Sequence, residues 1–160
     1  MRLLLTAVLF IAVAMLFVPS VHAQQYYQAV INGAQEAPPN GSPASGFGCF
    51  VLNPDNTLDY LVSYAGLTGV ESAAHIHGPA PIGINAGVVF PFAVGSPKIG
   101  TFGPLTAAQV ADLAGGLYYV NIHSTVFPAG EIRGQILLSG ESCATPTEES
   151  TWGAIKTLYE

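Results

Sequence analysis

The sequence predicts an all-β fold, specifically an antiparallel Greek-key β-sandwich with one short helix. From Tyr26 onward, short runs of β-prone residues are separated by glycine, proline and asparagine, which is the usual pattern of sandwiches and barrels. Within residues 57–65 the side chains alternate in character, so one face of this strand is expected to turn inward. Residues 106–113 carry helical signals instead.

The expected strands are bounded by turn-forming residues. A hairpin should join the second and third strands, because Pro54 presets its own φ angle and the flanking Asn and Asp residues tolerate left-handed backbone. A further turn at residues 127–130 should join the last two strands. Residues 38–46 are rich enough in Pro, Gly and Ser to be a loop. The strands are expected at residues 26–33, 46–52, 57–65, 73–77, 87–93, 99–102, 117–123 and 131–138.

The expected helix begins at a recognisable capping sequence. Thr106 is a good N-cap residue, and Gln109 stands three positions later, as in a capping box. Gly115 and Gly116 should end the helix.

The chain begins like a secretory signal peptide. Arg2 precedes an apolar run over residues 3–18, and Pro19 and the small residue Ala23 follow. We expect residues 1–23 to be removed and the remainder to be secreted, into an extracellular or periplasmic space. The apolar run is short for a membrane span, so no span is expected after cleavage.

The remainder divides into three parts by composition. Residues 24–139 should form one domain, and the polar residues 140–150 a linker. The short C-terminal tail, residues 151–160, would place Trp152, Ile155 and Tyr159 on one stripe of a helix. Because so short a helix is marginal alone, the tail should act as a cell-surface or export tag, pack on its own domain, or fray.

Charge argues against nucleic acid as a partner. The chain has ten acidic residues, and loss of the leader would leave Lys98, Arg133 and Lys156 as the fixed cations. Phosphate binding depends on clustered Lys and Arg, which this chain lacks.

The cysteines are Cys49 and Cys143. In an oxidising compartment they can form one disulfide, which would close a long loop and stabilise the fold by roughly 3–5 kcal/mol. The alternative is two unpaired thiols.

Three histidines form the candidate functional site. On a strand, His75 and His77 would share one face, and His123 lies in another alternating apolar run. If one sheet brings them together, three neutral imidazoles would suit copper or zinc with a water in an open position. Their second nitrogens would then need an acceptor, which Glu71, Ser124, Asn121 or a backbone carbonyl could supply. The alternative is three hydrogen-bonded structural histidines.

Glu131 and Arg133 alternate onto the same face of the last expected strand, which allows a local pair or a shared network. Arg133 would either tie loops together through several carbonyls or serve as an anion anchor beside the histidines. No catalytic residues are predicted, since the sequence contains no GxSxG elbow and neither cysteine is near a histidine along the chain.

Four fragments together resemble the CHRD domain, named for its repeats in the animal protein chordin. They are AHIHGPA at 74–80, NAGVV at 85–89, GLYYVNIHS at 116–124 and FPAGEIRGQI at 127–136. The resemblance extends over about residues 26–138. It implies an exported domain that acts as a binding or structural module for a protein or cell-surface ligand whose identity the family does not supply.

The His-x-His pair with a later strand histidine is also similar to part of the copper site of the Cu/Zn superoxide dismutase family, which shares the sandwich architecture. That family has further histidines and an aspartate for a bridged zinc, and the expected mature chain has no fourth histidine. The sequence therefore favours a secreted CHRD-type module. The alternative is a copper or zinc protein, redox-active or redox-inert, with a three-histidine site.

Overall fold

The structure, a computed structural model, describes residues 23–142. Residues 1–22 of the expected leader, the tail at 151–160 and most of the linker lie outside the described residues. The described residues include no helix long and apolar enough to cross a membrane.

The predicted all-β fold with one short helix is confirmed. The strands are β1 Gln25–Asn32, β2 Ser45–Leu52, β3 Leu58–Ala65, β4 Glu71–His77, β5 Val88–Pro91, β6 Lys98–Phe102, β7 Tyr119–Ser124, β8 Ile132–Gln135 and β9 Leu137–Ser139; a 3₁₀ turn, η1 Gly33–Gln35, follows β1, and α1 is Ala107–Ala114.

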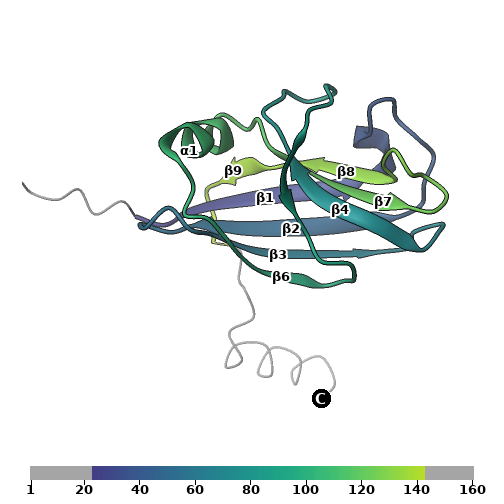
Figure 1. The fold of residues 1–160 in the computed structure, drawn as a ribbon, viewed down its shortest axis with the longest axis horizontal. Helices are drawn as coiled ribbons and strands as arrows, with labels where there is room; N and C mark the ends of the chain where they lie inside the picture. Colours follow the sequence, from purple (N-terminus) through teal and green to yellow (C-terminus); the bar gives the residue numbers. More distant parts are fainter. Residues whose placement is uncertain (1–22, 143–160) are drawn as a thin grey trace, which may run out of the picture.

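All described strands belong to one antiparallel sheet in the order β5-β4-β7-β8-β1-β2-β3-β6, with β9 also paired to β1. The two layers of the expected sandwich are therefore halves of one sheet, which curls until it is nearly closed (Figure 1). The halves are joined where Asn32 of β1 pairs with Arg133 of β8.

Aromatic rings bring the two sheet edges together. Phe90 of β5 stacks on Phe102 of β6, with ring centroids 4.7 Å apart, and Phe102 stacks on Tyr60 of β3 at 4.5 Å. Such pairs contribute roughly 0.5–1.5 kcal/mol beyond their buried area. Packing thus completes the barrel-like shape where the strand ladder ends.

The core lies inside the curled sheet and is built by strict alternation along its strands. On β4, for example, Ala74 and Ile76 are fully buried and point inward, so the residues between them point outward. Helix α1 covers one end of the sheet (Figure 1), where Leu113 is completely buried. Burial of a leucine side chain contributes roughly 1.5–3 kcal/mol.

The helix begins as its capping sequence predicts. The Thr106 side chain accepts a hydrogen bond from the Gln109 amide, and the Gln109 side chain accepts one from the Thr106 amide. Two N–H groups that have no partner within the helix are thereby satisfied.

The last expected strand, residues 131–138, is divided in the structure. Ile136, between the two pieces, is fully buried, and its N–H still donates to the carbonyl of Tyr118, the residue just before β7, whereas residues 137–139 pair with β1. The chain therefore leaves the β7 ladder after β8 and pairs with β1 as β9.

Two loops cover the outer face of β7 and β8. They are residues 33–44, which follow β1, and residues 78–87, which connect β4 to β5. Beneath them the outward side chains are polar yet buried, which is unusual for an outer sheet face. These side chains are Asn121, Glu131, Arg133 and Gln135, and the buried carboxylate of Glu36 comes from the 33–44 loop itself.

Candidate metal centre

Strand register brings the three histidines to one place. His75 and His77 alternate with the buried Ala74 and Ile76, so both imidazoles project from the outer face of β4. The adjacent strand β7 pairs His123 with Ala73, which is two residues from His75. Each imidazole is partly buried.

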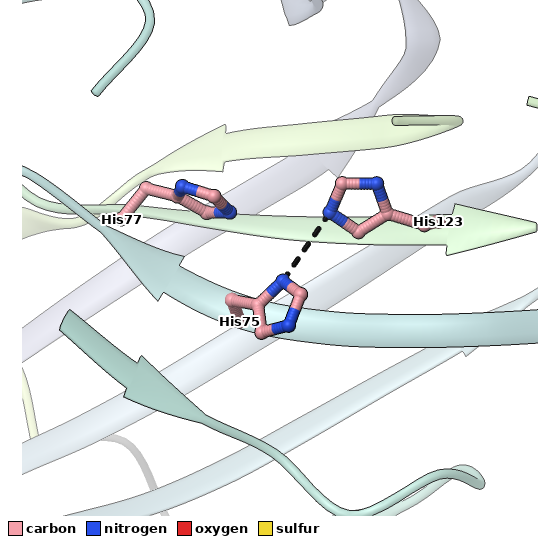
Figure 2. A group of neighbouring side chains, drawn as sticks. All are labelled: His75, His77 and His123. Carbon is pink, nitrogen blue, oxygen red and sulfur yellow. Dashed lines mark hydrogen bonds between the residues drawn. The ribbon is translucent and has the colours of Figure 1, made fainter. Parts of the chain in front are cut away.

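The ligand atoms of the three imidazoles converge. One nitrogen from each ring lies within 4.8 Å of the corresponding nitrogens of the other two. Nδ1 of His75 lies 3.3 Å from Nε2 of His123, and the dashed line in Figure 2 marks this contact between the two rings. An ion bound to nitrogen at about 2 Å fits between donors at such separations after small side-chain shifts.

Backbone carbonyls orient two of the rings. Nδ1 of His77 donates to the Ala86 carbonyl at 2.9 Å, and Nδ1 of His123 donates to the Pro128 carbonyl at 3.0 Å. A proton held on Nδ1 leaves the Nε2 lone pair free for a metal. The same arrangement is common among metal-binding histidines in proteins.

Nε2 of His77 is buried and, within the described part of the chain, has no hydrogen-bond partner. Buried polar atoms are nearly always satisfied, so an orphaned acceptor needs an explanation. His77 is one of the three residues whose ring nitrogens converge, and Nε2 is its nitrogen that is not engaged with a carbonyl. A metal ion there would satisfy it.

Electrostatics favour the neutral forms of His75 and His77. Burial lowers the pKa of His75 and of His77 below the ordinary value for histidine, and the neighbouring His123 lowers both further. The hydrogen bond to Ala86 opposes this for His77, while Arg133 adds to it. Neutral imidazole is the form that binds metal.

Tyr119 links the histidines to Arg133. Its ring is nearly parallel to that of His77, with centroids 5.2 Å apart, and the Arg133 guanidinium lies 3.5 Å from the Tyr119 ring centre. The Tyr119 hydroxyl accepts from the amide of Ala86, whose carbonyl orients His77. The tyrosine therefore positions both the ring and its acceptor.

Arg133 is buried and holds the loop at residues 78–87. It donates to the Ile84 carbonyl at 3.0 Å, to Oδ1 of Asn85 at 3.3 Å and to Oε1 of Gln135 at 3.3 Å. Its contacts are those of a residue that ties a loop to the sheet.

Glu131 has different partners. Its carboxylate accepts from the Ser42 hydroxyl and from the amide and hydroxyl of Thr68. Among residues 23–142 the one salt bridge joins Lys98 to Glu71, so Glu131 and Arg133 do not form an ion pair.

Glu36 is part of the polar layer, although sequence patterns did not indicate it. Both of its carboxylate oxygens accept from Nδ2 of Asn121, at 3.0 and 3.1 Å. Burial raises the pKa of Glu36 to about 7, against the lowering effects of Asn121 and Arg133. Its only sequence signal was an acidic residue in a Pro-rich loop.

Gly130 permits this close packing. Its φ is +138°, and a Cβ there would meet the Asn121 amide and the Glu36 carboxylate at under 3 Å. This explains the glycine of the FPAGEIRG turn in physical terms.

The predicted disulfide involves one cysteine that the structure describes. Cys49 is buried on the outer face of β2, whereas Cys143 lies just outside the described residues. The disulfide therefore stays a prediction.

The fold and site define a class: a barrel-like antiparallel domain with a cluster of imidazoles on its outer face. A family model, the CHRD domain, matches residues 27–136, which is most of the chain. The chain belongs to the CHRD-domain family, as its fragments suggested. No curated protein and no solved structure matches the chain significantly.

Proposed function

We propose that this protein is an exported CHRD-domain protein that binds one copper or zinc ion through His75, His77 and His123. The observation that carries the proposal is the convergence of three ligand nitrogens within 4.8 Å of one another. Carbonyl acceptors on two of the rings support it, because they leave Nε2 of both rings free to bind the ion.

The ligand chemistry suits these two metals. Three imidazoles favour copper and zinc over calcium and magnesium, which prefer oxygen ligands. With three protein ligands, a fourth position stays open for water or another small ligand. Copper at such a position would supply redox chemistry, and zinc would supply a Lewis acid.

Metal analysis tests the proposal. Purified protein should retain close to one equivalent of copper or zinc after dialysis, and a His75→Ala, His77→Ala, His123→Ala variant should retain none. Glu141→Gln removes an exposed carboxylate outside the cluster and serves as the matched control. Equal metal content in the triple variant and the wild type would refute the site.

Export is tested separately. N-terminal sequencing of protein recovered from the medium or periplasm should give Gln24 as the first residue. A chain that keeps residues 1–23 and stays in the cytoplasm would contradict this part of the proposal.

A second role, as a binding module for a protein or cell-surface ligand, is favoured by the surface beside the site. Ile82 and Ile84 are 67% and 56% exposed at the tip of the 78–87 loop. An open pocket of about 510 Å³ lies between this loop and Pro38 and Pro39 of the 33–44 loop. Exposed apolar side chains beside a pocket are typical of interaction sites.

This role can be tested by titrating labelled protein onto intact cells of the organism that produces it. An Ile82→Ser, Ile84→Ser variant should bind more weakly than wild type, whereas Val70→Ser, at a distant exposed position, should not. Unchanged binding by the double variant would exclude this surface.

A further inference from the structure

An apolar pocket lies on the outer face of the sheet, away from the histidines. Its volume is about 380 Å³, and it is lined by β2, β3 and β6. Cys49, Leu61 and Ile99 are cross-strand partners in the ladder and form one row through it. Ile99 is 69% exposed, so the row is open to an occupant.

The described chain ends near this row. Strand β9 pairs with β1, placing Leu137 opposite Gln28 and Ser139 opposite Tyr26. Gln28 in turn pairs with Cys49 of β2. Strands are spaced by about 4.8 Å, so Cys49 lies roughly 10 Å across the sheet from β9.

Cys143 is close enough along the chain to reach it. Four residues beyond Ser139 span up to about 13 Å when extended, and bridged cysteines have Cα atoms roughly 5.5 Å apart. Because Cys49 projects from the outer face, the chain would cross the outer side of β1. A disulfide would then place the beginning of the remaining segment, the 17 residues 144–160, at one end of the apolar row.

We propose that a Cys49–Cys143 disulfide anchors residues 144–160 on this outer face, where Trp152 and Ile155 cover the pocket. The occupant follows from the chain itself. This segment contains apolar side chains at helical spacing that need a surface to bury them. A short tether gives it an effective concentration near the millimolar range, which favours it over free competitors.

Trp152 is the single tryptophan of the chain, so its fluorescence reports on the tail alone. In oxidised, metal-free protein its emission should be shifted to the blue, and acrylamide should quench it less than in a synthetic peptide of residues 144–160. Ile99→Asn should move both the emission wavelength and the acrylamide quenching toward the values of the peptide. Val30→Asn changes a strand residue 62% exposed outside this pocket and should have no effect.

A Cys143→Ser variant provides a test that alters no described residue. It should lose most of the protection from quenching, and circular dichroism should remain that of a folded sheet.

Three results would overturn the proposal. The first is wild-type emission identical to that of the peptide, and the second is protection that survives both Ile99→Asn and Cys143→Ser. The third is protection that disappears on dilution, which would assign the pocket to a second copy. Because the assays use metal-free protein, none of these outcomes bears on the metal site.

Discussion

His75 and His123 lie 48 positions apart in the sequence, yet Nδ1 of the first is 3.3 Å from Nε2 of the second. At that separation both imidazoles cannot easily carry a positive charge, because like charges in a partly desolvated site repel. One neutral ring can donate a hydrogen bond to the other across this distance, and a cation bound by His75, His77 and His123 would engage all three rings at once. Predictions about metal, pH and stability follow from this geometry.

Metal binding should withstand mild acid. Burial lowers the pKa of His75 and His77, so both rings stay neutral at pH values somewhat below the usual 6.5 of histidine. Bound metal, measured after equilibration between pH 4.5 and 7.5, should therefore be lost with a midpoint below 6.5. A midpoint above 6.5 would contradict the lowered pKa of His75 and His77.

The same shift sets the sign of the stability effect in metal-free protein. Below pH 6.5 the unfolded chain binds more protons at these positions than the folded chain does, so the free energy of unfolding should fall as the pH drops. Wild type should lose more stability between pH 7 and 5 than a His75→Asn, His77→Asn variant in urea titrations. If the free energy of unfolding changed equally with pH in the two proteins, the lowered pKa of His75 and His77 would be contradicted.

Glu36 should have the opposite pH dependence. Its pKa is raised to about 7 by burial, so the folded state holds its proton where the unfolded state does not. Stability from this group is present below pH 4.5 and is lost as the pH rises through 7. A shift of this size corresponds to something on the order of 3 kcal/mol at most.

Glu36→Gln isolates this effect, because the amide oxygen can still accept from Asn121. The variant should match wild type at pH 4 and exceed it in free energy of unfolding at pH 8. Chemical denaturation at the two pH values measures the difference. A variant that is less stable at pH 8 would show that the carboxylate is favourably paired there.

Arg133→Met should weaken both the fold and the metal centre. Loss of the guanidinium leaves the Ile84 carbonyl and Oε1 of Gln135 without this donor, at a cost of about 2–4 kcal/mol. The loosened loop also carries the Ala86 carbonyl that orients His77, so metal affinity should fall roughly 10-fold or more.

Denaturation and metal competition measure the two effects of Arg133→Met. Asn85→Ala removes one Arg133 contact and the bond from Nδ2 of Asn85 to the Ala37 carbonyl, but it keeps the guanidinium on Ile84 and should give smaller changes in both. Unaltered metal affinity in a folded Arg133→Met protein would show that Arg133 does not support the metal centre.

The Lys98–Glu71 pair should be essential to the fold at the opposite edge. Both side chains are almost fully buried, at 2% and 5% exposure, and Nζ of Lys98 also donates to the carbonyls of Ala93 and Gly95. Glu71→Gln would leave a buried cation without its counter-ion, which costs about 3–5 kcal/mol.

The matched control is the double variant Glu71→Gln, Lys98→Met, which removes both charges. It should recover part of the stability lost in Glu71→Gln, as thermal denaturation can show. If Glu71→Gln alone were as stable as wild type, this would indicate that solvent reaches the Lys98–Glu71 pair.

Local sequence patterns determined much of this protein. The alternation in β3 and β4, the turn at Pro54 and the capping box at Thr106 are each decided by a few adjacent residues, and the structure has all of them. The outward projection of His75 and His77 also follows from alternation, because Ala74 and Ile76 must be buried. These features depend on short-range sterics and hydrogen bonds that a single segment contains.

Only the tertiary structure decided how distant segments meet. Strand order places His123 beside β4, separates Glu131 from Arg133 by giving each its own loop partners, and sets Glu36 over Asn121. It also divides the last strand at Ile136, whose side chain is drawn into the core. Such contacts depend on which strands become neighbours when the whole apolar surface is buried, and that is a property of the complete fold.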